Sequence, residues 1–212
     1  MSIYCHTNYN ARLKTFTFCN NKLTDFPDYI CYLVNLKILY LYNNNLNNLP
    51  TKIGNLINLE DLHLYNNKLD SLPVEIGNLI NLQELRLKNN QLSNLPTEIG
   101  NLCNSQKIYL SNNQLQSLPA EIGNLRNLKI LYLQSNKLQS LTAEILKIKN
   151  ILNIDNTSYS IDNLNIDNEI LIFSSLTDKL NNLPINTTEI WLKSNIENDL
   201  IKLPFGCVIK YF

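Results

Sequence analysis

The chain has 212 residues, and its 18 basic residues balance its 18 acidic residues, so its formal net charge is zero. This balance, without any run of lysine or arginine, argues against a nucleic-acid-binding surface, because phosphate contacts need clustered positive charge. The first thirty residues contain several charged side chains and no continuous apolar stretch, so we expect neither a secretory signal nor a membrane-spanning helix.

A regular repeat begins after residues 1–12, which we interpret as an N-terminal lead-in. From residue 13 to residue 150 the frame L-x-x-L-x-L-x-x-N-x-L recurs six times with a period of 23 residues. A fixed period of this length with this leucine pattern is typical of a solenoid of stacked coils. The asparagine of the frame stands at Asn21, Asn44, Asn67, Asn90, Asn113 and Asn136.

Within each repeat the segment L-x-x-L-x-L alternates apolar and polar residues, which predicts a short strand with one buried face. Successive strands run in the same direction, and each return segment has the dozen or more residues that a parallel pairing requires. Such crossovers are normally right-handed. The predicted fold is therefore an α/β solenoid, a right-handed superhelix with a concave parallel sheet and short helical or extended segments on the convex side.

The repeated asparagine follows the strand, where the chain bends inward and its backbone groups leave the sheet while still buried. A buried unpaired polar group costs about 1–3 kcal/mol, and an amide side chain can both donate and accept hydrogen bonds. We therefore predict a structural asparagine ladder that bonds the backbone of its own and the adjacent repeat, rather than a ligand site.

Leucine-proline pairs follow at 49/50, 72/73, 95/96 and 118/119. Proline fixes φ and lacks an N–H group, so it suits a turn onto the convex side. The next residues, such as Thr97 to Leu102, space apolar residues three apart and predict a single helical turn. We expect this turn to end at Gly54, Gly77, Gly100 and Gly123 in a left-handed C-cap.

The pattern changes after Asn150. Residues 151–168 predict a degenerate repeat or a loop, because Tyr159 stands where the ladder asparagine is expected. In residues 169–212 leucine-proline pairs recur at 183/184 and 203/204, a distance too short for a helical return, so we predict shorter coils with extended backs that cap the solenoid. Trp191 is expected on the concave side of its strand.

The consensus LxxLxLxxNxLxxLPxxIGNLxNL, clearest from Leu36 to Leu102, resembles the intracellular 23-residue leucine-rich repeats of Ras-suppressor, LAP-type and plant Ras-group proteins. This resemblance implies a protein partner, with a small GTPase or another signalling protein as examples. The tail, with TDKLNNLP from Thr177 and IKLPFGC from Ile201, resembles repeat proteins of amoebae and of the giant viruses that infect them.

The cysteines indicate the cellular compartment. There are five, they are scattered along the chain, and they form no dense group such as the caps of secreted leucine-rich repeat proteins. An odd, scattered set favours a reducing environment. We therefore expect a cytoplasmic protein, or one in the host cytoplasm if its source is viral.

Function is expected on the concave face, where the strand residues between the core leucines project. Equivalent residues of neighbouring strands lie about 4.8 Å apart, so they form one continuous surface. Tyrosine and arginine are enriched in binding hot spots. The predicted protein-binding residues are Tyr40, Tyr42, His63, Tyr65, Arg86, Lys88, Tyr109 and Tyr132.

Two interpretations of these tyrosines remain open: they form a binding site, or they reflect AT-rich coding and simply pack beside each other on the sheet. His63 has a simple alternative as an isolated exposed histidine. For Asp61 and Glu84, next to Arg86 and Lys88, the prediction is a solvated charge cluster.

Catalysis is not indicated by the sequence. The chain has two histidines, five glycines without a phosphate-binding pattern, no G-x-S-x-G and no metal-ligand spacing; Cys19, beside Tyr42, has no evident base. The predicted function is a non-catalytic protein-interaction scaffold without cofactors, metals, nucleic-acid partners or membrane contact. The alternative is a self-associating structural or packaging component of a virion or host assembly.

Overall fold

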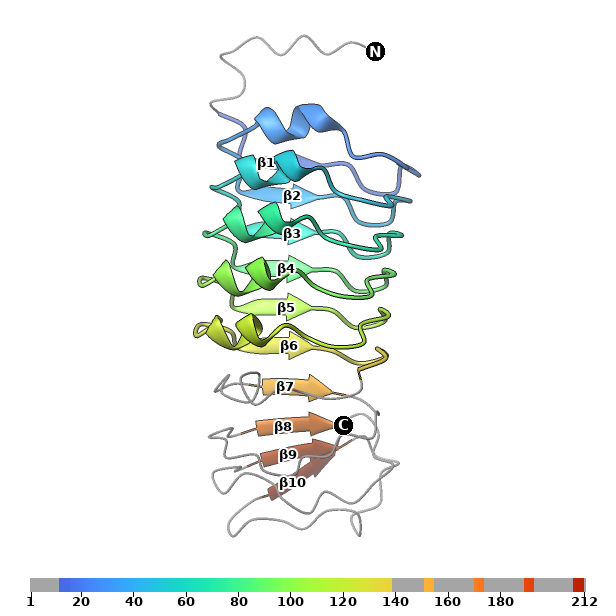
Figure 1. The fold of residues 1–212 in the computed structure, drawn as a ribbon, viewed down its shortest axis with the longest axis vertical. Helices are drawn as coiled ribbons and strands as arrows, with labels where there is room; N and C mark the ends of the chain where they lie inside the picture. The colour runs from blue at the N-terminus through green and yellow to red at the C-terminus, as the bar shows by residue number, and fades with distance from the viewer. Residues whose placement is uncertain (1–11, 139–150, 155–169, 174–188, 193–207, 212) are drawn as a thin grey trace.

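Ten parallel strands stack in chain order into one sheet in the computed structural model (Figure 1). The structure describes residues 12–138 and the strands at 151–154, 170–173, 189–192 and 208–211. The strands are β1 Thr15–Thr17, β2 Ile38–Tyr40, β3 Asp61–His63, β4 Glu84–Arg86, β5 Lys107–Tyr109, β6 Ile130–Tyr132, β7 Ile151–Ile154, β8 Ile170–Phe173, β9 Glu189–Leu192 and β10 Val208–Tyr211. The predicted parallel solenoid is confirmed.

Each of the first six strands contributes one residue to the core and two to the outer face. In β2, Leu39 is fully buried while Ile38 and Tyr40 remain partly accessible. Leu39 pairs with Leu62 of β3, which pairs with Leu85 of β4. The pairing therefore advances by 23 residues per coil and aligns identical positions of the repeat. Burying this leucine column stabilises the stack by about 1.5–3 kcal/mol for each fully buried side chain, and the other buried apolar positions of the repeat add to it.

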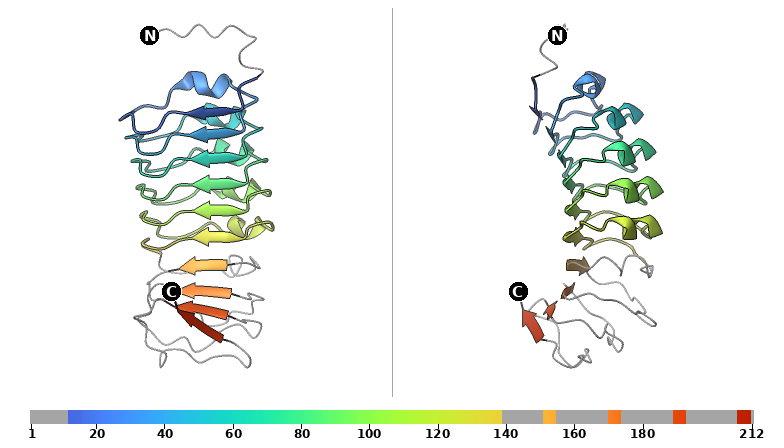
Figure 2. Two further views of the ribbon diagram at one scale, coloured as in Figure 1. Left: turned by 180° about the vertical axis from the view of Figure 1, so that it is seen from behind. Right: turned by 90° about the vertical axis from the view of Figure 1, so that its left-hand side faces the viewer.

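Short 3₁₀ helices form the side opposite the strands (Figure 2). They are η1 Asp28–Tyr32, η2 Thr51–Asn55, η3 Val74–Asn78, η4 Thr97–Asn101 and η5 Ala120–Asn124. A proline precedes each helix in an extended conformation, as Pro96 does with φ −66° and ψ 151°. Because proline has no N–H group to leave unpaired, it begins the turn without losing a hydrogen bond.

The predicted left-handed glycine caps are wrong. Gly54, Gly77, Gly100 and Gly123 all lie inside the 3₁₀ helices, and the first three have no positive φ. The reason for glycine is the next coil: a Cβ on Gly77 would lie 2.5 Å from the backbone oxygen of Glu98. The missing side chain allows adjacent coils to approach on the convex side.

The left-handed conformation occurs instead one residue before the ladder asparagine. Asn43, Asn66 and Asn89 each have φ of 56°, and Asn112 and Ser135 have φ of 55°. Asparagine tolerates this conformation better than most residues other than glycine. The doubled asparagine of the repeat thus places the chain reversal at its first residue and the ladder at its second.

The ladder asparagines bond the backbone of two coils. The Asn90 amide donates to the carbonyl oxygens of Leu64 and Leu87, both at 3.0 Å, and its Oδ1 accepts from the N–H of Leu69 at 3.0 Å. Asn44, Asn67, Asn113 and Asn136 repeat this arrangement. At the first coil, the Asn21 side chain donates to the carbonyl oxygen of Cys19, and the Asn21 backbone N–H donates to Asn44 Oδ1.

The strand spacing shortens towards the C-terminus. Residue 131 pairs with 152, 152 with 171, 171 with 190 and 190 with 209, so the steps are 21, 19, 19 and 19 residues. Trp191 lies in β9 at the register position of Ile172 and Lys210. β7 begins the segment for which the sequence predicts a degenerate repeat or a loop, whereas Tyr159 and the predicted extended backs lie outside the described residues.

Candidate functional site

The stack is curved, and the strands line the inner side of the curve while the 3₁₀ helices lie on the outer side (Figure 2). The side chains that alternate with the buried leucines therefore project from a concave surface. Most of them are partly accessible, including Tyr40, Tyr65 and Tyr109. This surface contains all eight residues that the sequence predicts for binding, which are Tyr40, Tyr42, His63, Tyr65, Arg86, Lys88, Tyr109 and Tyr132.

Aromatic rings stack between neighbouring coils on this face. Tyr40 stacks on His63 with ring centroids 4.2 Å apart, and Tyr42 stacks on Tyr65 at 4.5 Å with nearly parallel planes. Further along, Tyr109 meets Tyr132 at 5.2 Å in a tilted arrangement. Pairs of this kind contribute about 0.5–1.5 kcal/mol beyond the area they bury. The two stacks form a continuous aromatic patch because Tyr40, at the end of β2, lies beside Tyr42, with ring centroids 6.3 Å apart.

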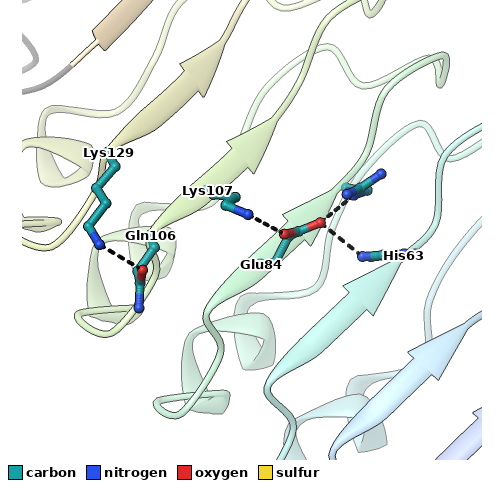
Figure 3. Close-up of polar contacts among 6 residues, drawn as sticks. His63, Glu84, Gln106, Lys107 and Lys129 are labelled. Atoms are coloured by element: carbon teal, nitrogen blue, oxygen red, sulfur yellow. Dashed lines mark hydrogen bonds and ion pairs between the residues drawn. The ribbon is translucent and has the colours of Figure 1, made fainter.

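Glu84 is the centre of a polar cluster on the same face (Figure 3). Its carboxylate accepts from Arg86 Nε, lies 3.2 Å from His63 Nε2 and pairs with Lys107 Nζ at 3.3 Å. Burial alone raises the pKa of Glu84, but the hydrogen bonds and charges of Arg86 and Lys107 outweigh this effect, and the pKa is lowered. The carboxylate is therefore held ionised between two cations.

The predicted solvated charge cluster is corrected in two respects. The Glu84 side chain is only 13% exposed, and its second cation is Lys107 rather than Lys88. Asp61, its neighbour in the register, makes no ion pair among the residues described, and its pKa is raised by burial and then by the nearby Glu84 charge. Glu84 and Lys107 were missed as site residues, although cross-strand register and the Glu84-x-Arg86 spacing place them beside His63 and Arg86.

His63 is not an exposed histidine. It is 9% exposed and lies between the Tyr40 ring and the Glu84 carboxylate. Burial, followed by the Arg86 charge, lowers its pKa, while the Glu84 contact acts in the opposite direction. A neutral imidazole is consequently favoured, and the residue supports the concave face through packing and one polar contact.

Arg86 connects the polar cluster to the remaining tyrosines. Its guanidinium carbon lies 5.0 Å from the centre of the Tyr109 ring, within the distance at which a cation is attracted to an aromatic face. A cleft of about 230 Å³ opens here, lined by Tyr65, Asn66, Arg86, Lys88, Asn89 and Tyr109. Lys88 belongs neither to the aromatic stacks nor to the Glu84 cluster. It lines this cleft together with Tyr65, Arg86 and Tyr109, which are also predicted binding residues.

A second hollow, of about 550 Å³, lies where the chain enters the strands. It is lined by the polar residues Lys37, Asn58, Glu60, Asn81, Gln83, Asn104, Gln106, Asn127 and Lys129. Its cations are already used, since Lys37 pairs with Glu60 and Lys129 donates to Gln106 at 3.0 Å (Figure 3). Its asparagines donate to the preceding coil, as Asn81 does to Ile57 at 2.9 Å. These bonds give the hollow a role in joining coils.

Within the described part of the chain, no group of three or more His, Cys, Asp or Glu residues is placed to hold a metal ion. The Cys19 thiol donates to the carbonyl oxygen of Tyr40 at 3.4 Å, and burial raises the pKa of Cys31 to about 11. Cys31 therefore lacks the lowered pKa that marks a reactive cysteine. No helix among the same residues is long and apolar enough to cross a membrane.

Comparison with protein families gives one consistent result. The family described as leucine-rich repeat region matches residues 11–104, and the family described as leucine rich repeat matches residues 80–138. No curated protein matches the chain at a significant level. The two matched segments together span residues 11–138, which include strands β1 to β6, the five 3₁₀ helices that the structure describes and the ladder asparagine Asn136.

Solved structures of several proteins resemble this fold. A leucine-rich repeat protein of Leptospira interrogans is 29% identical over 94% of this chain and 65% of its own, with a TM-score of 0.57. The plant peptide hormone receptor RGFR1, solved with RGF2, is 27% identical over 94% of this chain and 32% of its own, with a TM-score of 0.65. The chain therefore spans less than two thirds of either protein.

Another similar structure is the leucine-rich repeat domain of the type III effector XopL. It is 24% identical over 93% of this chain and 75% of its own, and its TM-score is 0.74. At this identity the likeness concerns the fold alone.

Proposed function

Since this chain is a leucine-rich repeat protein, we propose that it is a non-catalytic interaction module whose concave face binds a segment of another protein. Such folds commonly act as scaffolds for protein–protein interaction, and the regular coils place chemically distinct side chains on a stiff surface. The proposal concerns the face formed by β2 to β6. The identity of the partner, including the small GTPase suggested by family resemblance, stays a prediction.

The observation that carries the proposal is the aromatic patch of Tyr40, His63, Tyr42 and Tyr65. Their rings are already stacked at 4.2 and 4.5 Å, so a partner that contacts them would immobilise few free rotamers. Binding is favoured when the cost of ordering side chains is small. Large, rigid aromatic groups with a polar tip are also the residues that most often dominate binding energy.

Two similar structures add support by analogy. RGFR1 was solved in complex with RGF2, and PEPR1 was solved with AtPEP1. Each receptor is 27% identical to this chain, which spans 32% of its length. We extend to this chain only the idea of a partner bound to the repeats, and its place on the concave face is our own proposal. The cytoplasmic location suggested by the scattered cysteines also stays a prediction.

A random-peptide phage-display library panned on the immobilised protein tests the proposal. Recovered peptides would be synthesised with a fluorescent label, and their affinities would be measured by fluorescence anisotropy. We expect Tyr42→Ala/Tyr65→Ala to weaken binding at least about tenfold, because two anchors are removed. Thermal unfolding of each variant would verify that it remains folded.

The matched control is Ile57→Ala/Ile80→Ala, which removes two apolar side chains that are 50% and 54% exposed and lie outside the concave face. This control should change affinity less than about twofold, as surface positions away from an interface usually do. Equal losses in both double variants, or a loss only in the control, would contradict the concave site. Concentration-dependent dimers that disappear with the tyrosine variant would favour self-association instead.

A further inference from the structure

The cleft beside the Tyr42–Tyr65 stack has an unbalanced charge. Its six lining residues are two tyrosines, two asparagines, Arg86 and Lys88, so it contains two cations and no carboxylate. Its volume of about 230 Å³ is below the roughly 300–1,000 Å³ of pockets that hold drug-sized molecules. The space suits one side chain of a larger partner.

Lys88 supplies an available charge. Its side chain is exposed, and it forms no ion pair with any residue that the structure describes. In the same column of the concave face, the equivalent positions of the next two coils are Ser111 and Gln134. The positive charge is therefore local and does not continue along the solenoid.

Arg86 is held in place by two contacts and still has N–H groups that can donate hydrogen bonds. Its Nε donates to Glu84, and its guanidinium lies over the Tyr109 ring. Within the described part of the chain, its Nη atoms make no hydrogen bond. A guanidinium held in this way presents its outer edge to a carboxylate without further loss of freedom.

Glu84 does not neutralise the cleft, because one carboxylate serves both Arg86 and Lys107. Lys88 lies outside that cluster, so Glu84 does not offset its charge. The other nearby acid, Asp61, pairs in the register with Glu84 and does not line the cleft. A positive potential therefore remains at the opening between Tyr65 and Tyr109.

The asparagine wall of the cleft is also fixed. Asn66 Nδ2 donates to Asn43 Oδ1 and Asn89 Nδ2 donates to Asn66 Oδ1, both at 2.5 Å. Each amide is thus oriented by its neighbour in the adjacent coil. The cleft consequently has a polar wall held by side-chain hydrogen bonds, an aromatic and cationic wall held by the Arg86 contacts, and one exposed cation, Lys88.

We propose that this cleft is an acidic-residue pocket, which binds the carboxylate of one Asp or Glu side chain in a partner protein between Arg86 and Lys88. This inference rests on the proposed function, and it names the chemistry of the partner: an acidic residue next to an apolar or aromatic residue that packs on Tyr42 and Tyr65. A nucleic acid fits less well, because its regularly spaced phosphates would find no further cation beyond Lys88 in this column.

The test uses the labelled peptides recovered from the phage library and the variant Lys88→Glu. The matched control is Lys68→Glu, which changes the net charge equally at another exposed lysine outside the cleft. We expect the recovered peptides to share an Asp or Glu, and Lys88→Glu to weaken their binding about tenfold or more. Lys68→Glu should change it less than about twofold, since rim charges mainly affect association rate.

A double-mutant cycle tests direct contact. Replacing the shared acid of the peptide by its amide should weaken binding to the wild-type protein about tenfold. It should weaken binding to Lys88→Ala clearly less, because only the Arg86 contact is then left to lose. Lys88 is exposed, so both variants should fold, and circular dichroism with thermal unfolding verifies this. Additive effects of the two changes would overturn the pocket.

The remaining outcomes separate the two proposals. Peptides that depend on Tyr42 and Tyr65 but share no acid, or that ignore Lys88→Glu, would overturn the pocket and leave the proposed function standing. Failure to obtain any peptide that depends on the two tyrosines would overturn both. Tighter, Lys88-dependent binding of a labelled single-stranded oligonucleotide than of any acidic peptide would assign the cleft to nucleic acid.

Discussion

Two asparagine ladders run side by side through the solenoid, and they differ in almost every physical respect. The inner ladder includes Asn67 and Asn90, each 8% exposed, whose amides bond backbone groups of two coils. The outer ladder includes Asn66 and Asn89, which are exposed and bond one another's side chains. Asparagines at adjacent positions of the repeat therefore have different roles: the inner ones bond buried backbone groups, and the outer ones bond each other's side chains at the surface.

The difference shows what each position requires. The inner position needs a group that donates twice and accepts once in a buried space, and an amide has the required geometry. The outer position needs a residue that adopts a positive φ, and its hydrogen bonds compete with water. The first requirement is chemical and the second is conformational, so substitutions should separate them.

Asn90→Leu should have the largest effect. It would leave the buried N–H of Leu69 without its partner, and a buried unpaired group costs about 1–3 kcal/mol. It would also remove one of the two donors to each of the Leu64 and Leu87 carbonyl oxygens, which keep their bonds from Asn67 and Asn113. Adding the two lost donor bonds to this cost, we expect a loss of at least about 2 kcal/mol in the free energy of unfolding, measured by urea denaturation. An unchanged denaturation midpoint would contradict the structural role of the inner ladder.

Asn89→Val should have an intermediate effect for another reason. Asn89 has φ of 56°, where a β-branched side chain approaches the following carbonyl and costs about 1–2 kcal/mol. The loss should therefore be conformational, and a matched Lys88→Val change at the preceding exposed position should not reproduce it. Equal stabilities of the two valine variants, measured by urea denaturation, would show that the positive φ is not maintained in solution.

The dependence of stability on pH distinguishes His63, which ionises, from the asparagine ladders, which do not. Its folded-state pKa is lowered from 6.5, so the neutral form is favoured in the fold. The corresponding stability is fully present above about pH 6.5 and is lost as the pH falls through the lowered folded-state pKa. Between about pH 7 and 5, thermal stability should therefore fall less in His63→Gln than in the wild type.

The ladders provide the control for this titration, because amides do not ionise. A variant at Asn89 should retain the wild-type pH slope at a lower overall stability. An identical slope in His63→Gln and the wild type would mean that His63 is as accessible in solution as an unfolded histidine. We expect this pH effect to be smaller than that of Asn89→Val.

Asn89→Gly should have the smallest effect. Glycine adopts positive φ without strain, so only the two exposed bonds to Asn66 and Asn112 are lost. We expect a change of less than about 1 kcal/mol, again by urea denaturation. A loss as large as that of Asn90→Leu would mean that the outer ladder also carries buried hydrogen bonds, and the distinction between the ladders would fail.

Much of the fold could be predicted because the 23-residue period fixes which residues repeat. Leu39, Leu62 and Leu85 recur at one position of the frame, and any stack of equal coils must bring them together. The glycine caps were mispredicted because Gly77 looks the same whether it reverses the chain or admits Glu98 of the next coil. Local sequence does not record the distance between coils.

The candidate site was predictable as a surface but not as a set of contacts. Alternation placed Tyr42, Tyr65 and Arg86 on one face, as the structure has them. The burial of His63 and the pairing of Glu84 with Lys107 depend on side-chain conformations between strands. The cleft beside Lys88 likewise follows from the position of Arg86 over Tyr109.

The sequence by itself therefore determined the period, the parallel order of the strands and the column of core leucines, because each follows from spacing along the chain. The tertiary structure decided which asparagine turns the chain, why glycine occurs in each 3₁₀ helix, and which charged groups remain unpaired on the concave face. Those properties depend on contacts between residues about one coil apart, where burial and geometry select among partners that the sequence leaves equivalent.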